Sequence, residues 1–432
     1  MSRLAAPDAD QRDAIATVDP MTGSGSPVPT GGGSPRTFRR WSNRDKPPHA
    51  HFLFRWIFPF VIVGLAVATV LLGLDAKDLV LNSRDGTISR NPTDPAAPGF
   101  SAEVVPTPTL LVVHTTDKGE LVGVAVMSLA SGDGGGTVLF FPTDLVVKLS
   151  TGDSTTLAKL FADAGNEGET VLRRQLTRMI DADLDSSIVL GSKTLAELIR
   201  PVAPLRYTLR DSVRTVQSGV TATLLRSGSV SISSVDQVQA ATEVLSPGEA
   251  GINRTARQTA FWQAWFDAVR LVPDRSSVLP TFDTGLPRFV KGLTVGTTRF
   301  EQAPFTEQTF KGLVLLIADT AGIRAITSTM IPFPQAYEPG ARLLVEVRNG
   351  VGDLGRNEPM SRRIVAAGGQ IVVLGNADAF GVAQSSVVFY NEDNRARAES
   401  LARSIGVANV QFTDRPGSSI EVTVTIGADF TP

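Results

Sequence analysis

Few side chains in this chain could carry thiol, imidazole or triad chemistry. The 432 residues include no cysteine, which excludes thiol catalysis, disulfides and thiolate metal sites. There are three histidines, and two of them, His49 and His51, stand beside a long apolar run. A histidine-built metal site is therefore not expected, and a Ser-His-Asp triad would have to use His114. A lone histidine is more often a residue on a strand surface.

A run of nineteen uncharged residues, Trp56–Leu74, predicts one membrane-spanning helix. At about 1.5 Å per residue it matches the roughly 30 Å thickness of the hydrocarbon layer. The residues before this run are mostly basic, with Asp45 as the single acidic residue among Arg36, Arg39, Arg40, Arg44, Lys46 and Arg55. The positive-inside rule then predicts a cytoplasmic N-terminus and an extracytoplasmic bulk, held at the cell membrane by a single pass. A cleaved signal peptide and a buried soluble helix are the rival interpretations, and the long tail and the absence of a polar face disfavour them.

Composition divides the rest of the N-terminal part. Residues 1–50 are rich in Gly, Pro, Ser and Thr and predict a disordered cytoplasmic tail, whose basic end would rest on anionic membrane lipid. Residues 75–104 are polar and contain NPTDPAAPG, which predicts a stalk. The formal net charge of −2 gives no basic field that would favour nucleic acid, so no nucleic-acid partner is expected.

Residues 105–300 predict an α/β layered domain. Apolar strands are expected at 110–113, 121–129, 137–141 and 187–190, with helices at 155–164, 170–180, 192–199 and 254–271. The last helix carries an aromatic stripe that indicates core packing. Residues 301–340 read as a connecting region with a helix or strand at 312–321. Residues 342–430 predict a small α+β domain in βαββαβ-like order.

The last ninety or so residues resemble a known domain. LLVEVRNG at Leu343–Gly350 is followed by a helix closing on AAGG, a strand ending GNA, and then SVVFY and AESLARSIG. This order is similar to the C-terminal domain of LytR-type proteins. The resemblance implies a cell-envelope module without established chemistry.

The preceding region resembles a diverged LytR-CpsA-Psr domain. VLFFPTDLVV at Val138–Val147 is similar to that family's strand ending S-I-P-R-D-T-x-V, and Arg254–Gln258 is similar to its D-x-x-R-x-x-R-Q segment. Active members move a glycan from a polyprenyl-pyrophosphate carrier to peptidoglycan. The resemblance implies Asp144 as metal ligand or base and Arg254 as phosphate clamp, both catalytic, with Arg257 and Gln258 joining Arg254 in substrate binding. Mg²⁺ is implied if the activity is retained.

The departures from this pattern weaken the clamp. Thr143 replaces the arginine of P-R-D, Gly251 replaces the aspartate three residues before Arg254, and Ala241–Leu245 has no arginine where the family carries R-x-R. Each lost charge-assisted hydrogen bond is worth about 1.5–3 kcal/mol. Arg173, Arg174 and Arg178 could substitute in space, although a solvated helix face is the simpler expectation.

Three functions remain open at the level of sequence. The first is a catalytically impaired family-like protein that acts as a binding or scaffold partner in cell-wall glycopolymer assembly. The second is an active phosphotransferase that joins a polyprenyl-pyrophosphate-linked glycopolymer to peptidoglycan, with Asp144, Arg254 and Gln258 converging on one pocket. The third, a DNA-linked regulator, is disfavoured because the chain shows no helix-turn-helix pattern.

Overall fold

The computed structural model describes residues 83–84, 87–88, 92–130, 132, 134–278, 285–415 and 417–432. The predicted tail and the membrane segment 56–74 lie outside these residues, as do residues 75–82, 85–86 and 89–91 of the predicted stalk. None of the helices in the described ranges has the length and apolar character needed to cross a membrane. The described residues belong to one compact unit, Asn82–Pro432.

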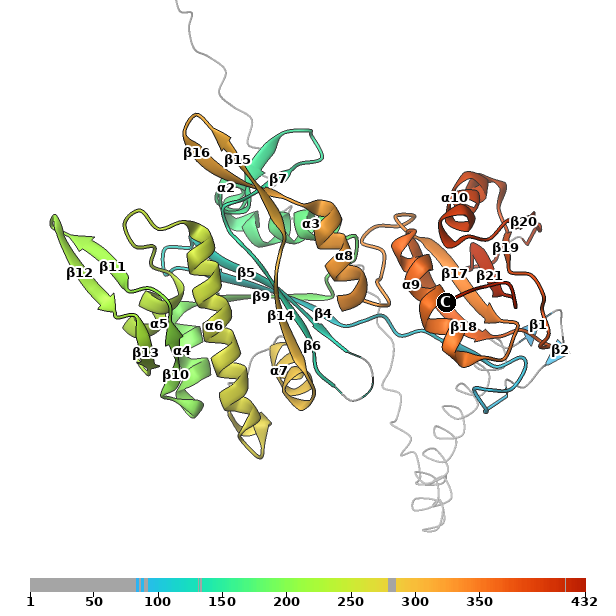
Figure 1. Cartoon of the computed structure of the whole chain (residues 1–432), viewed down its shortest axis with the longest axis horizontal. Helices are drawn as coiled ribbons and strands as arrows, with labels where there is room; N and C mark the ends of the chain where they lie inside the picture. Colours follow the sequence, from blue (N-terminus) through green and yellow to red (C-terminus); the bar gives the residue numbers. More distant parts are fainter. Residues whose placement is uncertain are drawn as a thin grey trace, which may run out of the picture. The chain divides into compact units, whose positions relative to one another are not determined.

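A mixed five-stranded sheet forms the centre of the α/β region (Figure 1). Its order is β14 (Thr298–Gln302), β6 (Gly136–Phe141), β5 (Leu121–Leu129), β4 (Thr109–Thr115) and β9 (Ser186–Gly191). The neighbouring pairs β14–β6 and β4–β9 are parallel, while β6–β5 and β5–β4 are antiparallel. All residues of β4 are buried, as expected for a strand with neighbours on both edges and cover on both faces.

Side chains of alternate residues enter two separate cores. Leu110 and Val112 of β4 face one core, and Leu111 and Val113 face the other. The first core includes residues of α4 (Ser192–Ile199), α5 (Val235–Thr242), α6 (Gly251–Arg270) and α7 (Leu286–Val295). The second includes residues of α2 (Leu157–Asp163), α3 (Gly168–Ile180) and α8 (Thr320–Met330). The sheet therefore has helices on both faces, and the predicted α/β layering is confirmed.

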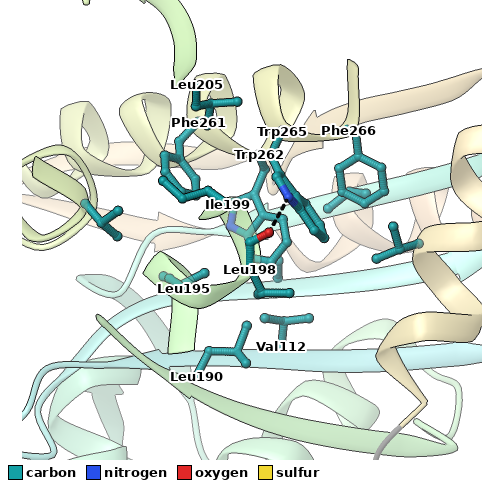
Figure 2. Packing of buried hydrophobic residues seen from close by; sticks show 14 of the residues in the cluster. Val112, Leu190, Leu195, Leu198, Ile199, Leu205, Phe261, Trp262, Trp265 and Phe266 are labelled. Atoms are coloured by element: carbon teal, nitrogen blue, oxygen red, sulfur yellow. Dashed lines mark hydrogen bonds between the residues drawn. The ribbon is translucent and has the colours of Figure 1, made fainter. Parts of the chain in front are cut away.

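The aromatic stripe of α6 fills the first core. Figure 2 shows Phe261, Trp262, Trp265 and Phe266 pointing from α6 towards α4 and β4. The indole Nε1–H of Trp265 donates to the Leu198 carbonyl oxygen at 3.1 Å. Core packing, as the sequence predicts, is therefore the role of this stripe.

Shorter elements complete the α/β region. Two antiparallel pairs, β10 (Leu205–Leu209) with β13 (Gly228–Ile232) and β11 (Val213–Gln217) with β12 (Val220–Leu225), lie between α4 and α5 in the chain. A second sheet has the order β15 (Phe305–Phe310), β16 (Leu313–Ala318), β7 (Leu145–Lys148) and β8 (Ser154–Thr156). The predicted connecting region 301–340 thus supplies strands and α8 to the α/β region.

A six-stranded sheet and two helices form the C-terminal domain. The strand order is β20 (Asn409–Phe412), β19 (Ser386–Phe389), β21 (Val422–Ile426), β17 (Leu343–Asn349), β18 (Gly369–Asn376) and β3 (Ser101–Glu103). The helices α9 (Asn357–Ala366) and α10 (Arg395–Ile405) pack on it around a third core. The expected βαββαβ order is present with β20 and β21 after α10, and β3 comes from the end of the predicted stalk. A short antiparallel pair, β1 (Ser83–Arg84) and β2 (Thr87–Ile88), precedes it in the chain.

Candidate functional site

The structure brings Asp144 and Arg254 together. Asp144 lies in the turn between β6 and β7, and Arg254 lies in the first turn of α6. A Cβ atom built on Gly251, the first residue of α6, would lie 2.6 Å from Asp144 Oδ2. The Asp144 carboxylate therefore occupies the N-terminal end of α6, where the helix dipole favours a negative charge.

Arg254 is held by neighbours of this turn. Its Nη2 donates to Thr143 Oγ1 at 2.7 Å, and its Nη1 donates to the Glu243 carbonyl oxygen at 3.3 Å. Burial lowers the pKa of the Arg254 guanidinium, and the nearby Asp144 opposes that shift. Because an arginine pKa starts far above neutrality, Arg254 stays a cation.

Two atoms of this pair have unused hydrogen-bonding capacity. Asp144 Oδ1 and Arg254 Nε are both buried and have no partner within the described part of the chain. Buried polar atoms without a partner are uncommon, and they often mark a place where a ligand or water binds. One atom is an acceptor and the other a donor, and a hydroxyl group can complement either role.

A buried network extends from Arg254 to two residues that the sequence did not single out. The Glu243 carboxylate accepts a short hydrogen bond from Ser192 Oγ, and its Oε1 lies 3.3 Å from His114 Nε2. The exposed fractions of Ser192 and His114 are 0% and 4%. Burial lowers the pKa of His114 more than Glu243 raises it, so the ring is neutral at pH 7. A neutral ring with its proton on Nε2 donates to Glu243.

The expectation that His114 lies on a strand surface is wrong. β4 is a central strand whose faces are both covered, so its alternation carries no polar face. The His114 side chain is instead part of the Glu243 network. For Glu243 the sequence did carry a signal, because this residue lies in the stretch where the resembled family carries arginines.

Arg257 and Gln258 are directed into the protein. Arg257 forms a buried ion pair with Glu249 and donates to the carbonyl oxygens of Ala241 and Val244. Gln258 Nε2 donates to the carbonyl oxygens of Val122 and Thr242 at 2.9 and 2.6 Å. These contacts fix α6 against β5 and the end of α5. The substrate-binding role implied for both residues stays a prediction.

The three arginines of α3 do not join the candidate site through any described contact. Arg173 donates to the Leu184 carbonyl oxygen and lies 3.7 Å from Asp183. Arg178 lines a pocket that also contains Lys148 and Met179. The structure thus gives Arg173 another partner and places Arg178 at a different surface.

The carboxylates do not assemble a resident metal site. Among the described residues, no group of three or more His, Asp or Glu side chains could hold a metal ion. Mg²⁺ can be held by one or two carboxylates together with substrate phosphates, and Asp144 Oδ1 offers one such oxygen. A single oxygen does not define a coordination shell, so the donor set does not fit a resident ion.

Comparisons identify the C-terminal part. Residues 342–430 match the model of the family described as LytR cell envelope-related transcriptional attenuator. These residues are a LytR C-terminal domain, as the sequence resemblance indicates. No curated protein matches the chain.

Solved structures give weaker likenesses. TagV of Bacillus subtilis is 13% identical, with 52% of this chain and 95% of that chain covered and a TM-score of 0.42. Protein gbs0355 of Streptococcus agalactiae is 14% identical, with 52% and 86% covered and a TM-score of 0.43. The LytR-CPS2A-psr family protein YwtF (TagT), solved with bound octaprenyl pyrophosphate lipid, is 11% identical, with 56% and 92% covered and a TM-score of 0.39. Values this low transfer no residue role to this chain.

Proposed function

We propose that this chain is a membrane-anchored cell-envelope protein with a LytR-CpsA-Psr-like domain of impaired catalysis, acting as a binding partner in cell-wall glycopolymer assembly. The LytR C-terminal domain supports the envelope assignment. The ligand class is the one that the sequence resemblance implies, a polyprenyl-pyrophosphate-linked glycan, with peptidoglycan and membrane lipid as further partners.

One observation carries the impaired state. Arg254 lies near three carboxylates, Asp144 at the N-terminus of α6, Glu249 and, at the end of α5, Glu243. The nearby Arg257 is already paired with Glu249. A pyrophosphate brings two or more negative charges and would meet Arg254 beside these acidic side chains. Like charges at such a site disfavour binding by the same electrostatics that an arginine clamp exploits.

The first test measures pyrophosphate chemistry directly. The full chain in detergent is incubated with a polyprenyl pyrophosphate and Mg²⁺, and released phosphate and transferred glycan are quantified. We expect neither product above the level of the Arg254→Ala variant. Mg²⁺-dependent cleavage that disappears in Arg254→Ala would overturn the impaired assignment.

A second test rebuilds the clamp. Thr143→Arg restores the arginine of the P-R-D pattern, and Glu243→Arg replaces the opposing carboxylate. Each regained charge-assisted bond contributes about 1.5–3 kcal/mol, so each single variant should bind polyprenyl pyrophosphate roughly 10- to 150-fold more tightly and the double variant at least about 100-fold more tightly. Glu243→Gln removes the negative charge and keeps the shape of the side chain. Comparing it with Glu243→Arg separates the loss of repulsion from the pyrophosphate from the attraction that a new arginine adds. Unchanged affinity in Thr143→Arg, in Glu243→Arg and in the double variant would contradict the proposal.

An active phosphotransferase is the second candidate, and the unbonded atoms of the pair favour it. Asp144 Oδ1 could accept the proton of an acceptor hydroxyl while Arg254 Nε–H donates to the hydroxyl oxygen. This function predicts transfer that is lost in Asp144→Asn, because an amide oxygen cannot take up the proton of the acceptor hydroxyl as a carboxylate does.

The topology needs its own test. We propose that residues 56–74 cross the membrane once with the N-terminus in the cytoplasm. Protease added to intact cells stripped of wall should digest the region beyond residue 92 and leave the basic tail protected. Protection of that large region until lysis would exclude the proposed orientation.

A further inference from the structure

A segment that precedes the α/β region is bound at an edge of the C-terminal sheet. β3 runs antiparallel to β18, with Glu103 opposite Val373 and Ser101 opposite Gly375. The flanking main-chain bonds run from Val104 N–H to the Val372 carbonyl oxygen at 3.0 Å and from Asn376 N–H to the Phe100 carbonyl oxygen at 2.7 Å. We call residues 94–104 the strap.

The receiving edge is shaped by Gly375, Asn376 and Ala377, the GNA that the sequence analysis noted. Asn376 is 3% exposed, and its Nδ2 donates to the carbonyl oxygens of Pro95 and Ala97 at 2.9 and 2.7 Å. A Cβ atom on Gly375 would lie 2.2 Å from the Phe100 carbonyl oxygen. The Ala377 carbonyl oxygen accepts from Gly99 N–H at 2.9 Å. All three residues of this segment therefore contact or closely approach the strap.

The strap itself is suited to release and rebinding. Only Val104 of the strap packs against the core of the C-terminal domain in the described contacts. Its exposed residues include Asp94, Pro95, Ala96, Ala102 and Glu103. Gly99 has a φ of +76°, a value that glycine adopts readily, so the strap turns before it pairs. Main-chain hydrogen bonds rather than buried area hold it, which is how an added peptide strand binds a sheet edge.

We propose that Gly375–Ala377 and the adjoining edge of β18 form a peptide-strand binding site of the LytR C-terminal domain, and that its resident ligand is the strap of the same chain. The ligand class is an extended peptide that presents two carbonyls in the register of Pro95 and Ala97 and then a strand. The domain thereby clamps the chain at the point where it arrives from the N-terminal side. The sixth strand of this sheet, β3, lies outside the matched region 342–430.

Cysteine pairing tests the resident ligand, because the chain has no cysteine of its own. The pairs 104/372 and 100/376 are hydrogen-bonded, so alternation makes Glu103/Val373 a non-hydrogen-bonded pair, whose side chains come closest. Glu103→Cys with Val373→Cys should form an intramolecular disulfide in most molecules under mild oxidation. The control Glu103→Cys with Gln411→Cys, on the opposite edge strand β20, should not. An unlinked 103/373 protein would overturn the proposal, and a cross-link in a mixture of the two single variants would overturn its intramolecular part.

Peptide binding tests the site. Ala102→Pro removes a main-chain donor from the strap and leaves the receiving edge intact. A labelled peptide of residues 93–105 should bind the full-length Ala102→Pro chain at least 10-fold more tightly than the wild type, where the tethered strap competes at high effective concentration. Adding Asn376→Asp, which replaces the donor amide by an acceptor, should abolish the gain while circular dichroism stays unchanged. Equal peptide binding by the wild type and Ala102→Pro would overturn the proposed site. Equal peptide binding by Ala102→Pro with and without Asn376→Asp would overturn it as well.

Discussion

At the scale of single residues, His114 links the candidate site to pH. Its folded-state pKa is lowered by burial, while the unfolded chain has a value near 6.5. As the pH falls, the unfolded state therefore takes up the proton first. Stability is complete above about pH 7 and decreases as the pH falls below about 6.5, by at most about 1.4 kcal/mol per pH unit.

The variant His114→Gln checks this expectation. Urea unfolding of both proteins between pH 7.5 and 5 should show a steeper acid-side loss for the wild type. His49 and His51 are present in both proteins, so their contributions cancel. Parallel pH profiles would show that the pKa of His114 is the same in the folded and unfolded states, contrary to the lowering that its burial causes.

Gly251 carries a second prediction at this scale. A Cβ at this position would lie 2.6 to 2.9 Å from three atoms of the Asp144 carboxylate group. Gly251→Asp, which restores the family pattern at one position, would place two carboxylates in one space. We expect the free energy of unfolding to fall by about 1–3 kcal/mol, through crowding and like-charge repulsion.

The double variant Gly251→Asp/Asp144→Ala provides the matched control. It removes the occupant and should recover most of the lost stability in urea unfolding. A Gly251→Asp protein as stable as the wild type would mean that the Asp144 side chain moves aside without cost.

The same residues show how far sequence could go. The pattern around Pro142 and the one around Arg254 predicted Asp144 and Arg254 as one site, and the structure brings them together. The sequence could not predict that Glu243 and Ser192 would join them, because the hydrogen bond between these two residues spans 51 positions in the chain and links different elements. Nor could it show that Arg257 would pair with Glu249, since a motif gives residue types and not their neighbours.

At the scale of elements, α6 carries a testable packing prediction. Trp265 is 1% exposed, and its indole N–H is bonded to the Leu198 carbonyl oxygen (Figure 2). Trp265→Phe leaves that carbonyl without this donor and should cost about 1–3 kcal/mol in the free energy of unfolding. Phe266→Leu removes comparable apolar contact without a hydrogen bond and serves as the comparison. A Trp265→Phe protein as stable as the wild type would show that water replaces the indole.

The elements divide into those that the sequence predicts and those that it does not. Long apolar runs and strong amphipathic periods predicted β5 and α4 to the residue and α6 to within three residues. The two helices pack in the first core, and β5 contributes to both the first and the second core. The pairs β10–β13 and β11–β12 were not predicted, since their strands are short and many of their residues are exposed. The run at 312–321 stayed ambiguous between helix and strand, and the structure resolves it as β16 followed by the start of α8.

At the scale of the whole described unit, the sequence left the pairing of distant segments open. Nothing local in residues 101–103 specifies β18 as their partner, because the paired residues lie 270 to 274 positions further along the chain. A buried arginine also joins the α/β region to the C-terminal domain. Arg342, only 5% exposed, donates to Asp181 Oδ2 and the Asp181 carbonyl oxygen at 2.7 and 2.9 Å, and to the carbonyl oxygens of Val365 and Gly369.

Replacing Arg342 should uncouple the α/β region from the C-terminal domain. Burial lowers the pKa of Arg342 and Asp181 opposes that shift, so the guanidinium stays charged and is stabilised mainly through its four bonds. Arg342→Met would leave a half-buried carboxylate and three carbonyls without this donor. Because Asp181 is 28% exposed, we expect a loss near the lower end of the range for broken buried pairs, about 3 kcal/mol. Arg362→Met is the matched control. Arg362 lies on α9, is 57% exposed and has a 3.7 Å ion pair, so its replacement should change stability by less than about 0.5 kcal/mol.

Urea unfolding followed by tryptophan fluorescence and by circular dichroism measures the coupling. The two signals should give coincident transitions in the wild type and separate ones in Arg342→Met, because the aromatic core lies in the α/β region. Coincident transitions with unchanged midpoints in Arg342→Met would show that the remaining contacts, among them the strap, suffice to couple the two.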